Sequence, residues 1–123
     1  MGHEKASLKN VFLAVGNHLI AQGRPAMLDG ECRYRAYGLS CAVGCLIEDE
    51  HYSEDFEGDG VDSERVVDAL KRSGVDFSDG DMVHMLSVLQ DTHDGSDPFT
   101  WIVELFDIGH SYGLVDKHWE FII

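Results

Sequence analysis

Three cysteines and a histidine in the first half of the chain could supply ligands to a zinc ion: Cys32, Cys41, Cys45 and His51. Two cysteines separated by three residues fit the spacing of structural zinc sites, in which four ligands converge as a tetrahedron. The residues around Cys41 and Cys45 are small and apolar, however, and in such surroundings cysteine packs as a small hydrophobe. We therefore expect both thiols to be buried, reduced and free of metal, and we predict no cofactor.

An acidic segment reproduces the first half of a calcium-binding EF-hand loop. Asp55, Glu57 and Asp59 stand at its first, third and fifth positions, and Gly60 stands at its sixth. The second half departs from the pattern, because Val66 occupies the twelfth position, where a bidentate glutamate is required. The missing ligand favours a solvated acidic loop over a calcium site.

A histidine followed by an aspartate, His93-Asp94, could provide a general base and the carboxylate that orients it. A cysteine nucleophile such as Cys41 would need a base of this kind and a lowered pKa, but apolar neighbours raise the pKa of a thiol. The pair could equally lie at a helix end, where a histidine interacts favourably with the helix dipole. No residue is assigned a catalytic role on this basis.

The charge of the chain is strongly negative, with 9 Lys and Arg against 23 Asp and Glu and a net charge of −14. Residues 48–64 hold nine acids and no base, and residues 73–116 hold nine more, again without a base. This balance disfavours direct binding to nucleic acid or to anionic membranes, and it suits a cationic partner. The alternative is that the charge only keeps a small protein soluble.

The elements that must position these residues belong to one small domain. A length of 123 residues with 44% hydrophobic residues supports a single acidic domain over residues 1–123. No run of about 18 apolar residues could cross a membrane, and the polar start does not have the shape of a signal peptide. We therefore expect a cytoplasmic protein without membrane association.

Apolar spacing and glycine positions predict a mainly α-helical α+β fold of four or five helices and one short β-hairpin around a single-layer core. Ser7 caps the first predicted helix, which ends at Gly23, and Asp29-Gly30 suits the turn of the hairpin. The apolar segment 39–47 is interpreted as a short buried helix, with a strand as the competing interpretation.

Further helices are predicted after the acidic loop of residues 48–60. Their start signals are Asp62 or Ser63, Ser78 with Asp81, and Asp97 followed by Pro98. The apolar residues of the last helix lie on two faces: Phe99, Ile102, Val103 and Phe106 on one, and Trp101, Leu105 and Ile108 on the other. We expect this helix to be central, and the apolar tail of residues 114–123 to pack against the domain or a second copy.

One segment has a distinctive order of residues: Tyr34-Arg35-x-x-Gly38-Leu39-x-Cys41-Ala42-Val43-Gly44-Cys45-Leu46-Ile47-x-Asp49-Glu50-x-Tyr52, continuing to Phe56-Glu57-Gly58 and later Leu89-Gln90-x-x-His93-Asp94. Over about a third of the chain, this pattern resembles a group of short, uncharacterised proteins encoded in phage and prophage genomes. The resemblance brings no activity, cofactor or catalytic residue. It implies a setting, the bacterial cytoplasm during phage infection or lysogeny.

Charge and setting together predict a phage or prophage accessory protein that binds a host protein with a basic site. The residues expected to form its acidic binding surface are Glu48, Asp49, Glu50, Asp55, Glu57 and Asp59. Because duplex DNA carries one charge per about 1.7 Å, dense carboxylates could act as a nucleic-acid mimic or inhibitor. Two alternatives stay open: a small cysteine- or metal-dependent enzyme centred on His93 and Asp94, and a homodimerising structural module.

Overall fold

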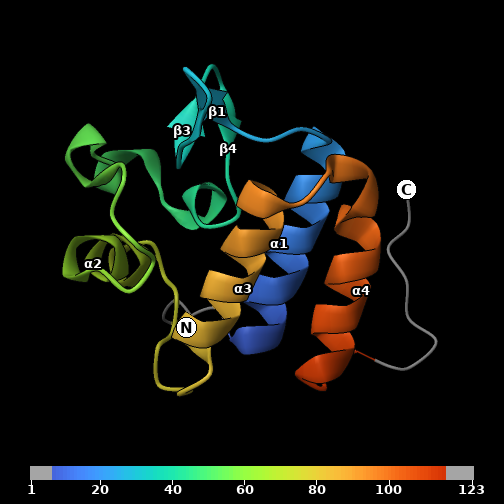
Figure 1. The fold of residues 1–123 in the computed structure, drawn as a ribbon. Coiled ribbons are helices and arrows are strands. Elements are labelled where there is room, and N and C mark those ends of the chain that lie inside the picture. Colours follow the sequence, from blue (N-terminus) through green and yellow to red (C-terminus); the bar gives the residue numbers. More distant parts are fainter. Residues whose placement is uncertain (1–6, 116–123) are drawn as a thin grey trace.

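The computed structural model describes residues 7–115 and confirms a mainly helical α+β fold for them (Figure 1). Four α-helices lie in this part of the chain: α1 (Leu8–Gln22), α2 (Glu64–Arg72), α3 (Met82–Gly95) and α4 (Trp101–Ser111). Two antiparallel strand pairs join β1 (Met27–Leu28) to β2 (Glu31–Cys32) and β3 (Arg35–Ala36) to β4 (Leu39–Ser40). Short 3-10 turns cover Gly44–Leu46, Asp49–His51, Glu54–Phe56 and Pro98–Thr100.

The helices α1, α3 and α4 lie side by side, while α2 and the hairpins lie on the other side of α3 (Figure 1). Phe12, Leu86 and Leu105, one from each of these three helices, are fully buried where the helices meet. A Cβ atom on Gly109 of α4 would lie 2.8 Å from Cζ of Phe12. The glycine therefore allows α4 to approach α1 closely enough to enclose the phenylalanine ring.

The helix ends follow the local signals in the sequence. The Ser7 hydroxyl accepts a hydrogen bond from the Asn10 amide at 3.4 Å, and Gly23 ends α1 in the left-handed conformation with φ of 70°. The predicted start of α2 after Ser63 is also confirmed, whereas α3 begins after Asp81, three residues later than the predicted cap at Ser78. Ser63 and Asp81 precede their helices without a capping hydrogen bond from the side chain.

The predicted hairpin is present, and a second hairpin follows it directly. Asp29 and Gly30 turn the first one with φ angles of 54° and 80°. Tyr37 and Gly38 turn the second one in the same way, with φ angles of 52° and 77°. A tyrosine rarely adopts positive φ, so the sequence carries no ordinary turn signal at this position and the prediction of a single hairpin was incomplete.

The interpretation of residues 39–47 as a helix was wrong, and its strand alternative holds only for Leu39–Ser40. The Cys41 amide donates to the Tyr34 carbonyl at 3.0 Å, across the second hairpin rather than along a helix. The chain then turns, and only Gly44–Leu46 forms a 3-10 turn. Cys41 is fully buried as expected, whereas Cys45 is only partly buried.

The last helix begins as predicted but is not central. The Asp97 carboxylate accepts from the Phe99 amide at 2.9 Å, which starts the Pro98–Thr100 turn and then α4. Because α1 and α3 cover only one side of α4, Trp101 on that side is buried. The opposite side leaves Phe99 94% exposed and Val103 59% exposed. The second apolar face therefore points to solvent instead of into the core.

Leu114 and Val115 pack against the core at the end of the described chain. The rest of the apolar tail, for which we predicted packing, lies outside the described residues. No helix in residues 7–115 is long and apolar enough to cross a membrane.

Candidate functional site

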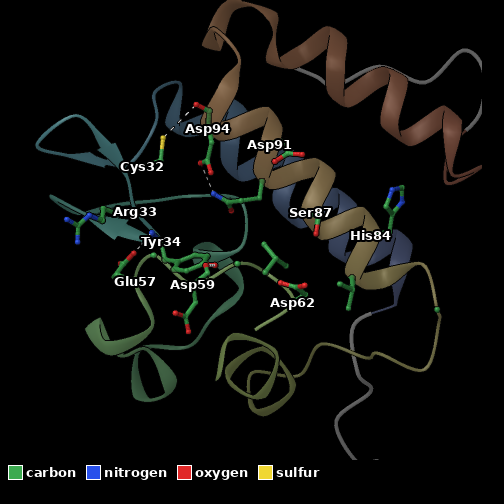
Figure 2. Close-up of a pocket in the computed structure, with 16 residues that line it drawn as sticks. Cys32, Arg33, Tyr34, Glu57, Asp59, Asp62, His84, Ser87, Asp91 and Asp94 are labelled. Atoms are coloured by element: carbon green, nitrogen blue, oxygen red, sulfur yellow. Dashed lines mark hydrogen bonds between the residues drawn. The ribbon is translucent and has the colours of Figure 1, made fainter. Parts of the chain in front are cut away.

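A polar cleft of about 730 Å³ separates α3 from the segment 57–62 (Figure 2). The outer face of α3 forms one wall, and the end of β2 together with residues 57–62 forms the other. The charged residues that line the cleft are Arg33, Glu57, Asp59, Asp62, Asp91 and Asp94. The lining thus contains five carboxylates and one guanidinium group, that of Arg33. Arg33 also lies 3.7 Å from the carboxylate of Glu31, which does not line the cleft. The cleft is suited to a cationic ligand.

Glu57 holds the second hairpin and is not available to a ligand. Its two carboxylate oxygens accept hydrogen bonds from the amides of Tyr34 at 2.8 Å and Arg35 at 3.2 Å. The hydroxyl of Tyr52 donates to the same group at 2.7 Å. A carboxylate with three donors has a structural role, because removing it would leave two amides without an acceptor.

Asp59 and Asp94 are also engaged within the fold. The Asp59 carboxylate accepts from the Ser63 hydroxyl at 2.9 Å and pairs with Arg65 at 3.0 Å. The Asp94 carboxylate accepts from the side-chain amide of Gln90 at 2.8 Å. The Asp59 bonds connect one wall of the cleft to α2, whereas the Gln90–Asp94 bond lies within α3, so both carboxylates are already engaged without a ligand.

Asp62 and Asp91 are the two carboxylates of the cleft without a hydrogen-bond or ion-pair partner within residues 7–115. Both are exposed, and they lie on different walls, Asp91 on α3 and Asp62 on the facing segment (Figure 2). Ser87 lies on α3 one turn before Asp91 and adds a hydroxyl, whereas His84, a further turn back, is hydrogen-bonded through Nδ1 to the Tyr112 hydroxyl. An ammonium or guanidinium group entering the cleft would find these carboxylates unpaired.

His93 is 1% exposed and uses both ring nitrogens. The Ala26 amide donates to Nε2 at 2.9 Å, so Nε2 carries no proton. The proton of the neutral ring therefore lies on Nδ1, which donates to the Asp94 carboxylate at 2.6 Å. The ring also stacks on Trp101. This arrangement joins the start of the first hairpin to α3.

The side chains of Cys32, His93 and Asp94 bring a thiol, an imidazole and a carboxylate within 4.8 Å of one another. Burial and the nearby Asp94 raise the pKa of the Cys32 thiol, and His93 has no free nitrogen to deprotonate it. A metal on Nδ1 would move the ring proton to Nε2, where it would face the Ala26 amide donor. The cluster therefore fits neither a cysteine nucleophile nor a metal site.

The other predicted metal ligands do not converge in the described chain. Cys32 belongs to the cluster at His93, whereas His51 lies with Glu48 and Glu50 in a separate exposed group. Burial raises the pKa of Cys41 and of Cys45 to about 12, so both thiols stay protonated at neutral pH. A protonated thiol is a poor metal ligand and a poor nucleophile.

The six residues of the predicted acidic surface separate into two groups. Glu48, Asp49, Glu50 and Asp55 are exposed on the 3-10 turns, with Asp49 paired to Arg35 at 2.6 Å. Glu57 and Asp59 instead face the cleft and hold the fold. The carboxylate of Glu57 bonds Tyr34, and that of Asp59 pairs with Arg65, so the two do not converge with Asp55 on one calcium position. The EF-hand pattern is therefore present in the sequence but not in the structure.

Sequence reasoning missed Asp62 and Asp91 as candidate binding residues. A usable signal exists on α3, because His84, Ser87 and Asp91 recur at steps of three and four and form a polar stripe. The position of Asp62 opposite this stripe depends on the path of the chain after Phe56, which local spacing does not predict.

Comparison with models of known protein families, with curated proteins and with solved structures finds no match for this chain. The interpretation of the cleft therefore rests on its own geometry and charge.

Proposed function

We propose that this protein is a non-catalytic phage or prophage accessory protein that binds a basic segment of a host protein in the cleft between α3 and residues 57–62. The observation that carries the proposal is the pair of carboxylates, Asp62 and Asp91, which lie on different walls of the cleft and have no partner within residues 7–115. The cleft volume of about 730 Å³ has room for lysine or arginine side chains. The setting, a bacterial cytoplasm, rests on the resemblance to phage and prophage proteins.

The exposed acids outside the cleft support the same function at longer range. Glu48, Glu50 and Asp55 extend the negative charge along the 3-10 turns beside the Glu57 wall. A surface of one sign raises the rate at which an oppositely charged partner is encountered, and salt weakens this effect. Such a surface would compete with nucleic acid for a basic site, as a mimic or inhibitor does.

The enzyme alternative has less support. A catalytic base needs a ring nitrogen that can take a proton from a substrate, and both nitrogens of His93 are bonded within the fold. Cys41 lies fully buried, away from the solvent that would carry a substrate.

The proposal is tested with a defined basic probe and a cleft variant. The probe is a fluorescent peptide of about ten residues that alternates arginine and glycine, and the variant is Asp62→Asn with Asp91→Asn. We expect the double variant to bind the peptide about two- to thirtyfold more weakly, because two exposed ion pairs are lost. Raising the salt to about 0.5 M should weaken binding to the unsubstituted protein steeply.

The control is Asp29→Asn with Glu64→Gln, which removes the same charge from exposed sites outside the cleft. Asparagine also tolerates the left-handed conformation at position 29, so this variant keeps its hairpin. Both variants are then used to capture host proteins from a bacterial lysate, with thermal unfolding as a check on folding. If the cleft variant keeps the affinity and the captured proteins of the control, the proposal is wrong.

A further inference from the structure

The outer face of α4 carries large apolar side chains in contact with solvent, which folding does not explain. Val103 and Phe106, the latter 36% exposed, are three residues apart and lie on one side of α4. Phe99 lies in the Pro98–Thr100 turn that leads into the helix, four residues before Val103, and is the most exposed of the three. Exposed apolar residues that gather on one face indicate an interaction surface more often than scattered ones do.

An apolar groove of about 520 Å³ continues this face toward α1. It is lined by Leu19, Ile20, Gly23, Asp97, Pro98, Phe99, Trp101 and Ile102. Its lining contains no lysine or arginine, and a single acid, Asp97, lies at its edge. The groove gives a partner side chain a place to be buried next to Phe99.

Carboxylates stand at both ends of the apolar face. Asp97 lies at the start of the Pro98–Thr100 turn, and Asp107 follows Val103 by one helical turn at the other end. Asp107 is exposed and has no hydrogen-bond or ion-pair partner within residues 7–115. No lysine or arginine occurs from residue 73 to residue 116, so among Lys, Arg, Asp and Glu only acids stand on α4 and on the turn before it.

We propose that the outer face of α4, formed by Phe99, Val103 and Phe106, binds a basic amphipathic helix of another protein. The apolar side of such a helix would cover Phe99 and Val103 and fill the groove. Its lysine or arginine side chains would meet Asp97 and Asp107. A second copy of this chain fits less well, because it would bring the same carboxylates and a further −14 charge against this face.

The test uses a synthetic helical peptide of about 18 leucine and lysine residues, with leucine at helical spacing. A peptide of the same composition in scrambled order controls for charge, and a peptide with glutamate in place of lysine controls for apolar contact. We expect the amphipathic basic peptide to bind at least about tenfold more tightly than either control. Hydrogen exchange should show protection of α4 on binding.

The decisive variant is Phe99→Ser with Val103→Ser, which alters only exposed positions. It should weaken binding of the amphipathic peptide about tenfold or more. Tyr37→Asn, which removes another exposed aromatic, should change it less than about threefold. The cleft variant Asp62→Asn with Asp91→Asn should weaken the amphipathic and the scrambled peptide alike, because both carry the same lysines, and should leave the ratio of their affinities unchanged. Because the cleft variant tests the function proposed for the cleft and the Phe99→Ser/Val103→Ser variant tests the face of α4, either proposal can fail while the other stands.

Unchanged affinity in the Phe99→Ser/Val103→Ser variant, or equal affinity for the glutamate peptide, would overturn the inference. Analytical sedimentation tests the remaining alternative, in which a second copy of this chain covers the face. If the unsubstituted protein is a dimer and the same variant is a monomer, the face belongs to a second copy and the basic helix is excluded.

Discussion

A Cβ atom placed on Gly44 would lie 2.1 Å from the backbone carbonyl oxygen of Tyr34. The same carbonyl accepts the Cys41 amide, so it cannot move away without breaking that bond. The ring of Tyr34 packs edge-on against Phe56, and its hydroxyl donates to the backbone of Asp59. The close approach at Gly44 therefore fixes the position of one wall of the cleft.

Replacement of Gly44 by alanine should lower the free energy of unfolding by about 1–3 kcal/mol or more, because a backbone atom occupies the space. The measurement is urea unfolding, in which the midpoint should fall with an unchanged slope. Gly80→Ala is the matched control, since a Cβ atom there meets nothing within 4 Å. Equal stability of the two variants would contradict the close approach.

Replacement of His93 by phenylalanine keeps an aromatic ring against Trp101 but leaves the Ala26 amide without an acceptor. We expect a loss of about 1–3 kcal/mol in the free energy of unfolding. Hydrogen exchange at the Ala26 amide should accelerate more than exchange at the centre of α1. If the Ala26 amide stays protected in this variant, its bond to Nε2 is not what holds the hairpin.

The three cysteines should differ in reactivity. Since burial raises the pKa of Cys41 and Cys45 to about 12, about one thiol in ten thousand is ionised at pH 8. Their reaction with iodoacetamide should rise only as the pH approaches 12, if the fold persists. Mass spectrometry of the native protein at pH 8 should therefore find slow labelling at Cys32 first, and three labels after unfolding. Labelling of Cys41 as fast as Cys32 would contradict its burial.

Glu57→Gln tests whether this acid holds the fold rather than a partner. A glutamine offers one acceptor oxygen, and its amide group would face a donor from Tyr34 or Arg35. The free energy of unfolding should fall by about 1–3 kcal/mol. Glu50→Gln, at an exposed position, should change it by less than about 0.5 kcal/mol. Thermal or urea unfolding of the two variants measures this difference. Equal free energies of unfolding would mean that Glu57, like Glu50, does not hold the fold.

Local chemistry predicted the parts of this fold that depend on neighbouring residues in the chain. Ser7 and Gly23 bound α1 because a hydroxyl cap and a left-handed glycine act within one helical turn. Asp29 and Gly30 form a hairpin because both residues tolerate positive φ. The same reasoning missed the turn at Tyr37, whose strained conformation is held by the pairing of Arg35 with Ser40 and by Glu57.

The sequence alone determined the excess of acids, their gathering after residue 48 and the two ends of α1, because composition and short-range geometry are properties of the chain itself. Only the tertiary structure decided which face of α4 is covered, since apolar residues such as Leu105 and Val103 occur on both faces and α1 packs on one side. It also decided which carboxylates stay unpaired. The amides of Tyr34 and Arg35 come from a distant segment and donate to Glu57, whereas Asp62 receives no such donor within residues 7–115, and no local pattern records that difference.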